Sequence, residues 1–349
     1  MTGPRPLRAP AYVLWEITRA CNLRCKHCLT RGGRAIEGEL TTDEALDVCE
    51  QLGALGVGAV ALMGGEPLLR GDWATLVEAL VGRSMSVSIV TNGVLFDREV
   101  AERVSALGVT QVVVSLDGGE RTHDQNRGRG SFSKAVEALG HAAEVGIPHR
   151  MAVTSVSKAN AHDLETLLRF LLERERGLDW VLNFSSLRHG GRMDLALRID
   201  ERTFCEVVEF THRARRRAGD RLSITGSHDM GYFSRRYGDL SGRDWNGCVA
   251  GLEALGIAAD GGIKGCLTLP DHLVDGNIRE VSLHDLWNDP DSFSYNRRFS
   301  VSDLKGECTG CEHGSRCRGG CLEFGLTMTG ELHSAPFCLW RIENRDERA

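Results

Sequence analysis

The sequence predicts an α/β fold, a partial (β/α)6 TIM-like barrel followed by a small cysteine-rich domain. Short apolar or β-branched runs alternate with segments of helical period up to about residue 185. This pattern is typical of a parallel sheet, because parallel neighbours need a crossover helix. Six strand and helix units are fewer than the eight of a closed barrel, so the barrel should be open along one side. From about Asp220 the long periodic runs stop, and seven of the twelve cysteines follow.

The expected elements follow one another at roughly even spacing. The strands are Val13–Ile17, Ala59–Met63, Val87–Val90, Val112–Leu116, Met151–Val156 and Trp180–Phe184. The helices are Thr42–Leu55, Trp73–Val81, Asp97–Leu107, Ser133–Val145, Asp163–Glu173 and Glu201–Arg217. Thr41 and Glu44 form a capping box that begins the first helix. The basic run His212–Arg217 is interpreted as the solvated end of the last helix.

Four segments are expected along the chain. Residues 1–11 form an N-terminal extension, residues 12–238 the barrel, residues 239–340 the cysteine-rich domain and residues 341–349 a charged tail. The boundary between the two domains is placed near Asp239–Trp245, where the composition changes.

Composition narrows the class of protein. Lys and Arg number 42 and Asp and Glu 48, so the net charge is 42 − 48 = −6, which argues against non-specific nucleic-acid binding. Met1–Pro10 lacks the apolar core of a signal sequence, and no apolar run approaches the ~20 residues of a membrane span. We therefore expect a cytoplasmic protein without a membrane partner. In that reducing compartment twelve cysteines favour metal ligation or catalysis over disulfides, although Cys49 and Cys205 fall on predicted helices as small buried side chains.

Three cysteines directly follow the first strand in a C-x3-C-x2-C arrangement: Cys21, Cys25 and Cys28. Three thiolates can hold one face of a cubane cluster and leave its fourth iron without a protein ligand, so that this iron can bind a small molecule. The spacing alone also allows a zinc knuckle, or a four-ligand site completed from elsewhere.

This motif, after the first strand of a βα-repeat domain, resembles the signature of the radical S-adenosylmethionine superfamily. The resemblance implies that the cofactor's methionine amino and carboxylate groups occupy the vacant iron. It further implies that an electron from the [4Fe–4S] cluster cleaves the sulfonium and that the resulting 5′-deoxyadenosyl radical abstracts a substrate hydrogen. His27 would pack near the adenine, where an aromatic ring is commoner.

Further motifs close successive strands, where a βα barrel builds its site. Gly64, Gly65 and Glu66 close the second strand; two glycines allow close backbone approach to a ligand, and Glu66 can accept from an ammonium group. The segment resembles the family's GGEP motif, which binds the methionyl amine. Thr91-Asn92-Gly93 closes the third strand, and Asn92 is expected among the cofactor contacts.

The fourth strand ends in Ser115-Leu116-Asp117-Gly118, and His123-Asp124-x2-Arg127-Gly128 follows. In similar enzymes the Ser and Arg of this region help to hold the cofactor's carboxylate. Ser115 and Arg127 are therefore expected there, since a guanidinium pairs with a carboxylate through two parallel bonds.

Seven cysteines follow the barrel: Cys248-x12-Gly261-x4-Cys266, then Cys308-x2-Cys311-x5-Cys317-x3-Cys321, and finally Cys338. Their spacing resembles the seven-cysteine pattern of the SPASM domain, with a structural zinc domain as the alternative. The resemblance implies two auxiliary clusters, hence three [4Fe–4S] clusters in all. One would be held by Cys308, Cys311, Cys317 and Cys338, and the other by Cys248, Cys266 and Cys321. Residues 241–247 contain no thiol, so the latter cluster is expected to have an open iron, a water or Asp244 as its fourth ligand.

The leading functional hypothesis is a radical enzyme that modifies a ribosomally made peptide, with the auxiliary clusters accepting an electron from the oxidised substrate. Only about twenty residues precede Cys21, so leader recognition would need a separate protein or a leader-independent mode. An external flavodoxin- or ferredoxin-type electron donor is expected. The alternatives are oxidation or dehydrogenation of a small molecule, such as an aminocyclitol, cofactor or haem precursor, and a non-enzymatic electron carrier. No general base is assigned, although four polar residues fall in segments that could face the barrel mouth: His189, His228, Asp229 and Tyr232.

Overall fold

The computed structural model describes residues 6–346 except residues 31, 186–191, 193–194, 239 and 242–244. Ten strands form one sheet in the order β10-β9-β8-β1-β2-β3-β4-β5-β6-β7. The strands are β1 (Tyr12–Thr18), β2 (Ala59–Gly64), β3 (Ser86–Thr91), β4 (Gln111–Ser115), β5 (His149–Val156), β6 (Leu178–Phe184), β7 (Leu222–Gly226), β8 (Ala254–Ile257), β9 (Gly262–Lys264) and β10 (Gly276–Asn277). From β8 to β7 all neighbours are parallel, whereas β9 and β10 continue the sheet antiparallel.

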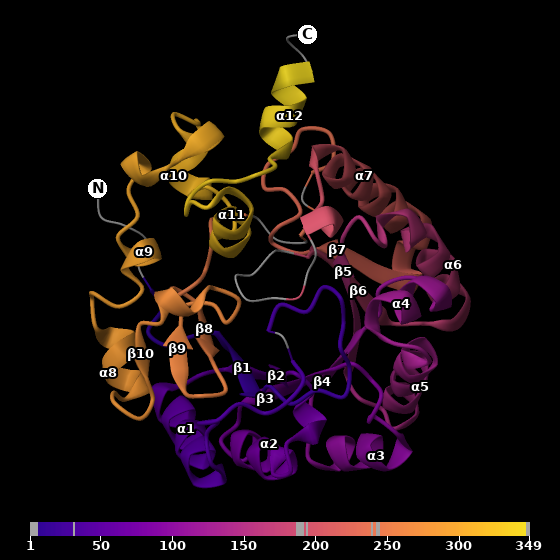
Figure 1. The fold of residues 1–349 in the computed structure, drawn as a ribbon, viewed down its shortest axis with the longest axis vertical. Coiled ribbons are helices and arrows are strands. Elements are labelled where there is room, and N and C mark those ends of the chain that lie inside the picture. The colour runs from indigo at the N-terminus through magenta and orange to yellow at the C-terminus, as the bar shows by residue number, and fades with distance from the viewer. Residues whose placement is uncertain are drawn as a thin grey trace.

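Helices follow the strands and cover the outer face of the curved sheet (Figure 1). In the barrel they are α1 (Thr42–Leu55), α2 (Trp73–Val81), α3 (Arg98–Ala106), α4 (Glu120–Arg127), α5 (Ser131–Glu144), α6 (Leu164–Arg174) and α7 (Glu201–Ala218). Beyond the barrel they are α8 (Leu283–Asn288), α9 (Ser294–Arg297), α10 (Gly314–Cys317), α11 (Leu322–Thr329) and α12 (Leu339–Asp346). The six predicted strands and six predicted helices are confirmed to within two residues, as is the capping box of Thr41 and Glu44.

The sheet is larger than the six strands expected. After α7 a seventh parallel strand, β7, pairs with β6, and β8 pairs with the opposite side of β1, with Tyr12 opposite Ala254. Both strands are short, so neither stands out in a sequence rich in glycine and charge. Because β8 belongs to the cysteine-rich part, the two parts of the chain share one continuous sheet.

Buried and half-buried side chains alternate along β6, so one face of this strand packs in the core and the other faces the interior of the barrel. Trp180 and Phe184 are buried and face α7, where Phe184 lies 5.4 Å from Phe204 between ring centroids. Phe184 also stacks on Phe324 of α11 at 6.0 Å. These contacts fix α11, and with it Cys321, against the end of β6.

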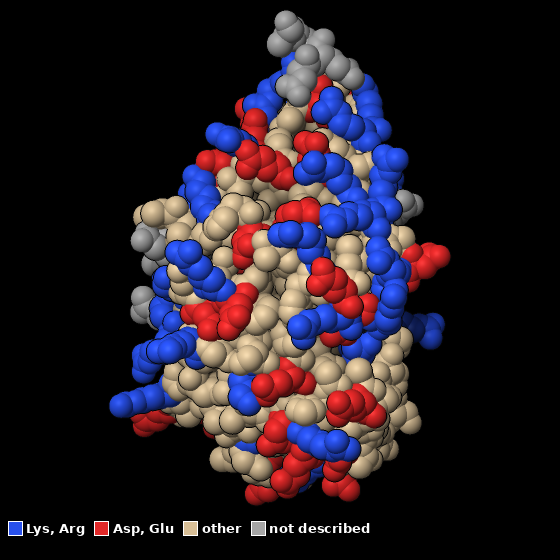
Figure 2. All heavy atoms as spheres, turned by 90° about the vertical axis from the view of Figure 1, so that its right-hand side faces the viewer, with Lys and Arg blue, Asp and Glu red and all other residues tan. Residues whose placement is uncertain are grey.

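The surface carries both signs of charge. Figure 2 shows Lys and Arg interspersed with Asp and Glu over one face, with basic side chains denser along one edge. The basic run at the end of α7 occupies its last turns, with Arg213, Arg216 and Arg217 exposed, which confirms the expected solvated helix end. Among the described residues, no helix is long and apolar enough to cross a membrane.

The charged C-terminus differs from the expected tail. Residues up to Asp346 form α12, and the buried carboxylate of Glu343 accepts hydrogen bonds from Ser234 Oγ (2.6 Å) and the Arg235 amide (2.8 Å). A buried carboxylate needs such donors, so part of the charge in this segment serves packing.

Candidate active site

The three N-terminal cysteines lie in the loop after β1, and each sulfur faces an N–H donor. The Leu23 amide lies 3.4 Å from Cys21 Sγ, Arg127 Nη1 lies 3.9 Å from Cys25 Sγ, and the Gly32 amide lies 3.3 Å from Cys28 Sγ. Donors of this kind stabilise negative charge on sulfur. The three side chains therefore suit the thiolates that ligate an iron–sulfur cluster.

Residues at the end of β2 form hydrogen bonds with the backbone that leads into this loop. The Gly65 amide donates to Thr18 O (2.8 Å) and the Glu66 amide to Ala20 O (2.7 Å). A Cβ on Gly64 would lie 2.2 Å from Thr18 O, and one on Gly65 would lie 2.2 Å from Ala20 O. The sequence predicted close approach to a ligand; in the structure the two glycines permit close approach to the cluster loop itself.

Glu66 lies at the centre of a small polar network. It is 0% exposed and accepts from Thr91 Oγ1 (2.8 Å) and the Asn92 amide (2.8 Å). Burial raises the pKa of Glu66 to about 7, against the opposing effect of these hydrogen bonds. The Asn92 side chain donates to Asn22 Oδ1 (2.7 Å), so the ends of β2 and β3 both hold the cluster loop.

On the other side of the loop a buried carboxylate, Asp117, joins two of the predicted residues. Arg127 Nε lies 2.5 Å and Nη2 3.3 Å from its oxygens, and His27 Nε2 lies 3.3 Å away. Burial lowers the pKa of His27 to about 4, so the imidazole is neutral at neutral pH. Two of the three guanidinium nitrogens of Arg127 are thus already engaged. Ser115 is the last residue of β4 and lies two residues before Asp117 in the sequence; its side chain is half-buried.

Asp117 lies in the motif that closes the fourth strand, but it was not among the predicted cofactor contacts. The available signal was an acidic residue directly after the fourth strand, ten residues before an arginine. Strand order alone does not say which side chains meet across the mouth, so the pairing needed the three-dimensional structure.

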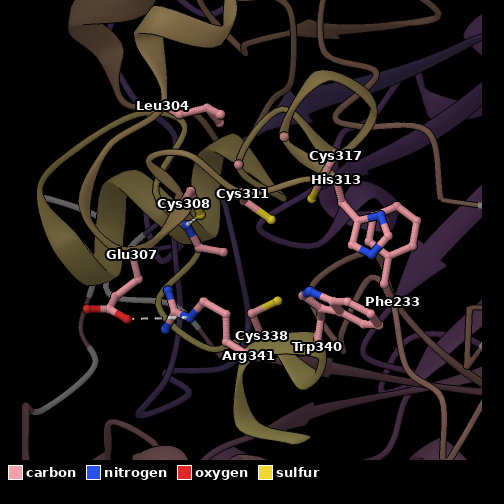
Figure 3. A pocket seen from close by; sticks show the side chains of 13 residues that line it. Phe233, Leu304, Glu307, Cys308, Cys311, His313, Cys317, Cys338, Trp340 and Arg341 are labelled. Atoms are coloured by element: carbon pink, nitrogen blue, oxygen red, sulfur yellow. Dashed lines mark hydrogen bonds and ion pairs between the residues drawn. The ribbon is translucent and has the colours of Figure 1, made fainter. Parts of the chain in front are cut away.

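Four of the C-terminal cysteines line one pocket: Cys308, Cys311, Cys317 and Cys338. Their sulfur atoms point toward a shared space (Figure 3), which Phe233, His313 and Trp340 flank. The Ala335 amide donates to Cys308 Sγ (3.3 Å). These are the same four thiols that the SPASM resemblance gives to one auxiliary cluster, and their convergence fits a four-thiolate cluster.

The other three cysteines gather in a separate place. Cys248 and Cys266 pack beside the small apolar cluster that contains Leu322, next to Cys321. Burial raises the pKa of Cys248, and the neighbouring charge of Cys266 raises it further. Burial likewise raises the pKa of Cys321, with a further contribution from Cys248. The proposed fourth ligand, Asp244, lies outside the described residues.

Asp229, one of the four polar residues considered near the mouth, lies at the end of β6. It is buried, its Oδ2 accepts from the Phe184 amide (2.8 Å), and burial raises its pKa to about 8. Tyr232 is also buried, and its hydroxyl accepts from the Cys321 amide (2.9 Å). His228 is exposed, and His189 lies outside the described residues.

The last two cysteines lie on helices, as predicted. Cys49 is fully buried in α1 and confirms the expectation of a small core side chain, whereas Cys205 in α7 is only half-buried.

Comparison with known proteins agrees with this arrangement. The model of the radical SAM superfamily matches residues 15–171, and that of the SPASM iron–sulfur cluster-binding domain matches residues 248–312. The mycofactocin maturase MftC of Mycobacterium tuberculosis is 31% identical over 350 residues, which cover 95% of this chain and 86% of the relative. The AdoMet-dependent heme synthase of Methanosarcina barkeri is 28% identical over 348 residues, 95% and 97% of the two chains.

Two solved structures share the fold. SuiB of Streptococcus suis bound to S-adenosylmethionine superposes with a TM-score of 0.74 at 19% identity, over 95% of this chain and 77% of that one. The enzyme anSMEcpe, bound to AdoMet and a peptide, superposes with a TM-score of 0.72 at 20% identity, over 96% and 94%. At these identities the likeness concerns the fold.

Proposed function

The chain belongs to the radical S-adenosylmethionine superfamily as a SPASM-domain enzyme, and from this we propose that it modifies a ribosomally made peptide. The observation that supports this substrate class most strongly is the 31% identity to a mycofactocin maturase across 95% of the chain. Membership of an enzyme family also excludes the non-enzymatic carrier.

The proposed cofactors are three [4Fe–4S] clusters and S-adenosylmethionine. When bound, this set supplies an electron for cleavage of the sulfonium, a radical that abstracts hydrogen and auxiliary sites that accept an electron from the substrate. The described thiols fit this set, with three donor-facing sulfurs after β1, four around one pocket and three beside α11.

The residues around the first site would orient the cofactor. Glu66 would accept a hydrogen bond from the methionyl ammonium. Its carboxyl group lies at the end of β2, where hydrogen bonds from Thr91 and Asn92 hold it in place. Ser115 and Arg127 would face the methionyl carboxylate, and His27 the adenine. Because Asp117 already engages Nε and Nη2 of Arg127, the guanidinium would offer the carboxylate chiefly Nη1.

A second substrate class has its own support. The heme synthase of Methanosarcina barkeri is matched over 97% of its length, so oxidation of a haem precursor is the alternative that we propose to test beside the peptide. In either case an external flavodoxin- or ferredoxin-type donor would supply the electron, and a small leader-binding protein would be an additional partner in the peptide case.

The deciding experiment is substrate-dependent turnover under anaerobic conditions. The reconstituted enzyme, S-adenosylmethionine and a reductant are incubated with a precursor peptide encoded beside the gene, or with a porphyrin precursor of haem. We expect the peptide to stimulate 5′-deoxyadenosine formation and to change mass, with deuterium passing from labelled peptide into deoxyadenosine. Stimulation by the porphyrin alone would overturn the peptide proposal, and no deoxyadenosine under any condition would contradict the radical chemistry.

A further inference from the structure

Asp117 is a fully buried carboxylate in contact with residues of three separate segments. Besides Arg127 and His27, the Ser155 amide of β5 donates to its Oδ1 at 3.1 Å. Burial alone would raise the pKa of Asp117, but the charge of Arg127 and the interaction with His27 outweigh burial and lower it to about 2. The group is therefore an ionised carboxylate surrounded by donors.

Of the two residues that Asp117 holds, Arg127 contacts the cluster loop and His27 belongs to it. Arg127 presents its remaining nitrogen, Nη1, to Cys25 Sγ at 3.9 Å. His27 lies between Cys25 and Cys28, and the Lys26 amide donates to Asn126 O of α4 (2.9 Å). One carboxylate at the end of β4 thus sets the orientation of a cation and an imidazole on the same side of the cluster loop.

Stability alone does not explain this network. In a buried ion pair the attraction between the charges is largely offset by the free energy lost when both charges leave water. Replacing such a pair by apolar residues of equal volume often leaves the stability of a protein unchanged or increases it. Groups that orient the surroundings of a metal site, in contrast, have large effects on that site. Asp117 belongs to this second kind, because Arg127 and His27, which it contacts, both lie beside the predicted ligand Cys25.

We propose that Asp117 is a positioning residue of the S-adenosylmethionine-binding cluster. It engages Nε and Nη2 of Arg127, turns Nη1 toward Cys25 and keeps His27 in place before Cys28. The proposal concerns cofactor binding and is independent of the substrate class.

The test compares D117N, R127Q and the double variant D117N/R127Q with the wild-type enzyme. In D117N one oxygen becomes an NH2 group, which cannot accept from the guanidinium. D124N is the matched control, because Asp124 lies on the same helix as Arg127 but holds the Gly130 and Phe132 amides at the start of α5. The measurements are the dissociation constant and KM for S-adenosylmethionine, the rate of deoxyadenosine formation without substrate, and the midpoint potential and EPR spectrum of the cluster with and without S-adenosylmethionine.

We expect D117N to weaken S-adenosylmethionine binding about 10- to 100-fold and to shift the potential of this cluster while leaving those of the auxiliary clusters in place. Because Asp117 acts mainly through Arg127, the double variant should bind within about threefold of R127Q. D124N should lower thermal stability without changing the dissociation constant.

Should D117N fail to fold, R127K carries the test, since it keeps the charge but cannot span both carboxylate oxygens; it should show the same loss of affinity. A D117N protein that melts at lower temperature yet binds S-adenosylmethionine with wild-type affinity and potential would overturn the proposal, as would full additivity in the double variant. Failure of the wild-type enzyme to form deoxyadenosine would instead contradict the proposed function.

Discussion

Gly65 shows how one missing side chain determines the position of a metal-binding loop. Its Cα lies so close to the chain before Cys21 that a Cβ would lie 2.2 Å from Ala20 O and 2.6 Å from Arg19 O. Both neighbours are backbone atoms, which cannot move aside as a flexible side chain can. The loop must therefore shift as a whole if a methyl group is added.

G65A should consequently lower deoxyadenosine formation about 100-fold, because a displacement of about 1 Å in an active site can cost that much. The control is G71A, since no atom lies within 4 Å of a Cβ at Gly71. Activity is measured anaerobically with S-adenosylmethionine and reductant. Wild-type activity of G65A would show that the contact with the cluster loop is unimportant.

Glu66 should make stability depend on pH. Its pKa rises from an ordinary 4.5 to about 7 on burial, so between these values the folded protein holds a proton that the unfolded chain has lost. This contribution is complete below pH 4.5 and is lost as pH rises through 7, with a slope of up to about 1.4 kcal/mol per pH unit.

The E66Q variant removes the titrating group, so its free energy of unfolding should fall less steeply than that of the wild-type apoprotein between pH 4.5 and 7. Denaturant unfolding at several pH values measures the difference. E102Q, on the exposed surface of α3 where Glu102 pairs with Arg98, should run parallel to the wild type. Identical slopes for E66Q and wild type would contradict a buried, protonated Glu66.

At the scale of elements, the barrel elements were predictable because each carries its own pattern. The runs of β1 to β6 are short and apolar, the helices between them are amphipathic, and the first helix begins with a capping box. Helix α4 escaped prediction because Glu120–Arg127 is almost wholly polar. It forms because its ends are held, with the His123 amide donating to Gly119 O and the Lys26 amide to Asn126 O.

The residue that begins helix α11 makes a hydrogen bond to a buried tyrosine. Cys321 is its N-cap residue, and the Cys321 amide donates to the buried Tyr232 hydroxyl at 2.9 Å. Y232F leaves that amide without this acceptor, which should reduce the free energy of unfolding by about 1 to 3 kcal/mol. It should also alter the EPR spectrum of the auxiliary cluster beside Cys321. Y237F, at a half-buried tyrosine beside α7, should cost less, and equal losses would refute the assignment.

At the scale of the whole molecule, the ten predicted ligand cysteines form three groups, located after β1, around the C-terminal pocket and beside α11. The first group lies after β1, whereas the pocket around Cys308 is built wholly from residues 233–341. Damage to that pocket should therefore leave the first site able to work.

C308A should lower iron and sulfide content and abolish substrate turnover, yet keep substrate-free deoxyadenosine formation within about twofold of wild type. Cys49 provides the control, because C49A changes a buried cysteine in α1 that is remote in sequence from every cluster motif. Iron analysis, sulfide analysis and chromatography of deoxyadenosine provide the readouts. Loss of substrate-free cleavage in C308A would show that the two sites are not independent.

The amino-acid sequence by itself determined the alternation of strands and helices, the three-cysteine motif and the spacing of the seven later cysteines. These features are local, because period, caps and ligand spacing act over a few residues. The tertiary structure alone decided that β7 and β8 extend the sheet at its two sides. It also decided that Gly64 and Gly65 touch the backbone that leads into the cluster loop and that Asp117 accepts hydrogen bonds from Nε and Nη2 of Arg127. Those contacts join residues far apart in the chain, and their geometry depends on how the whole sheet curves and packs.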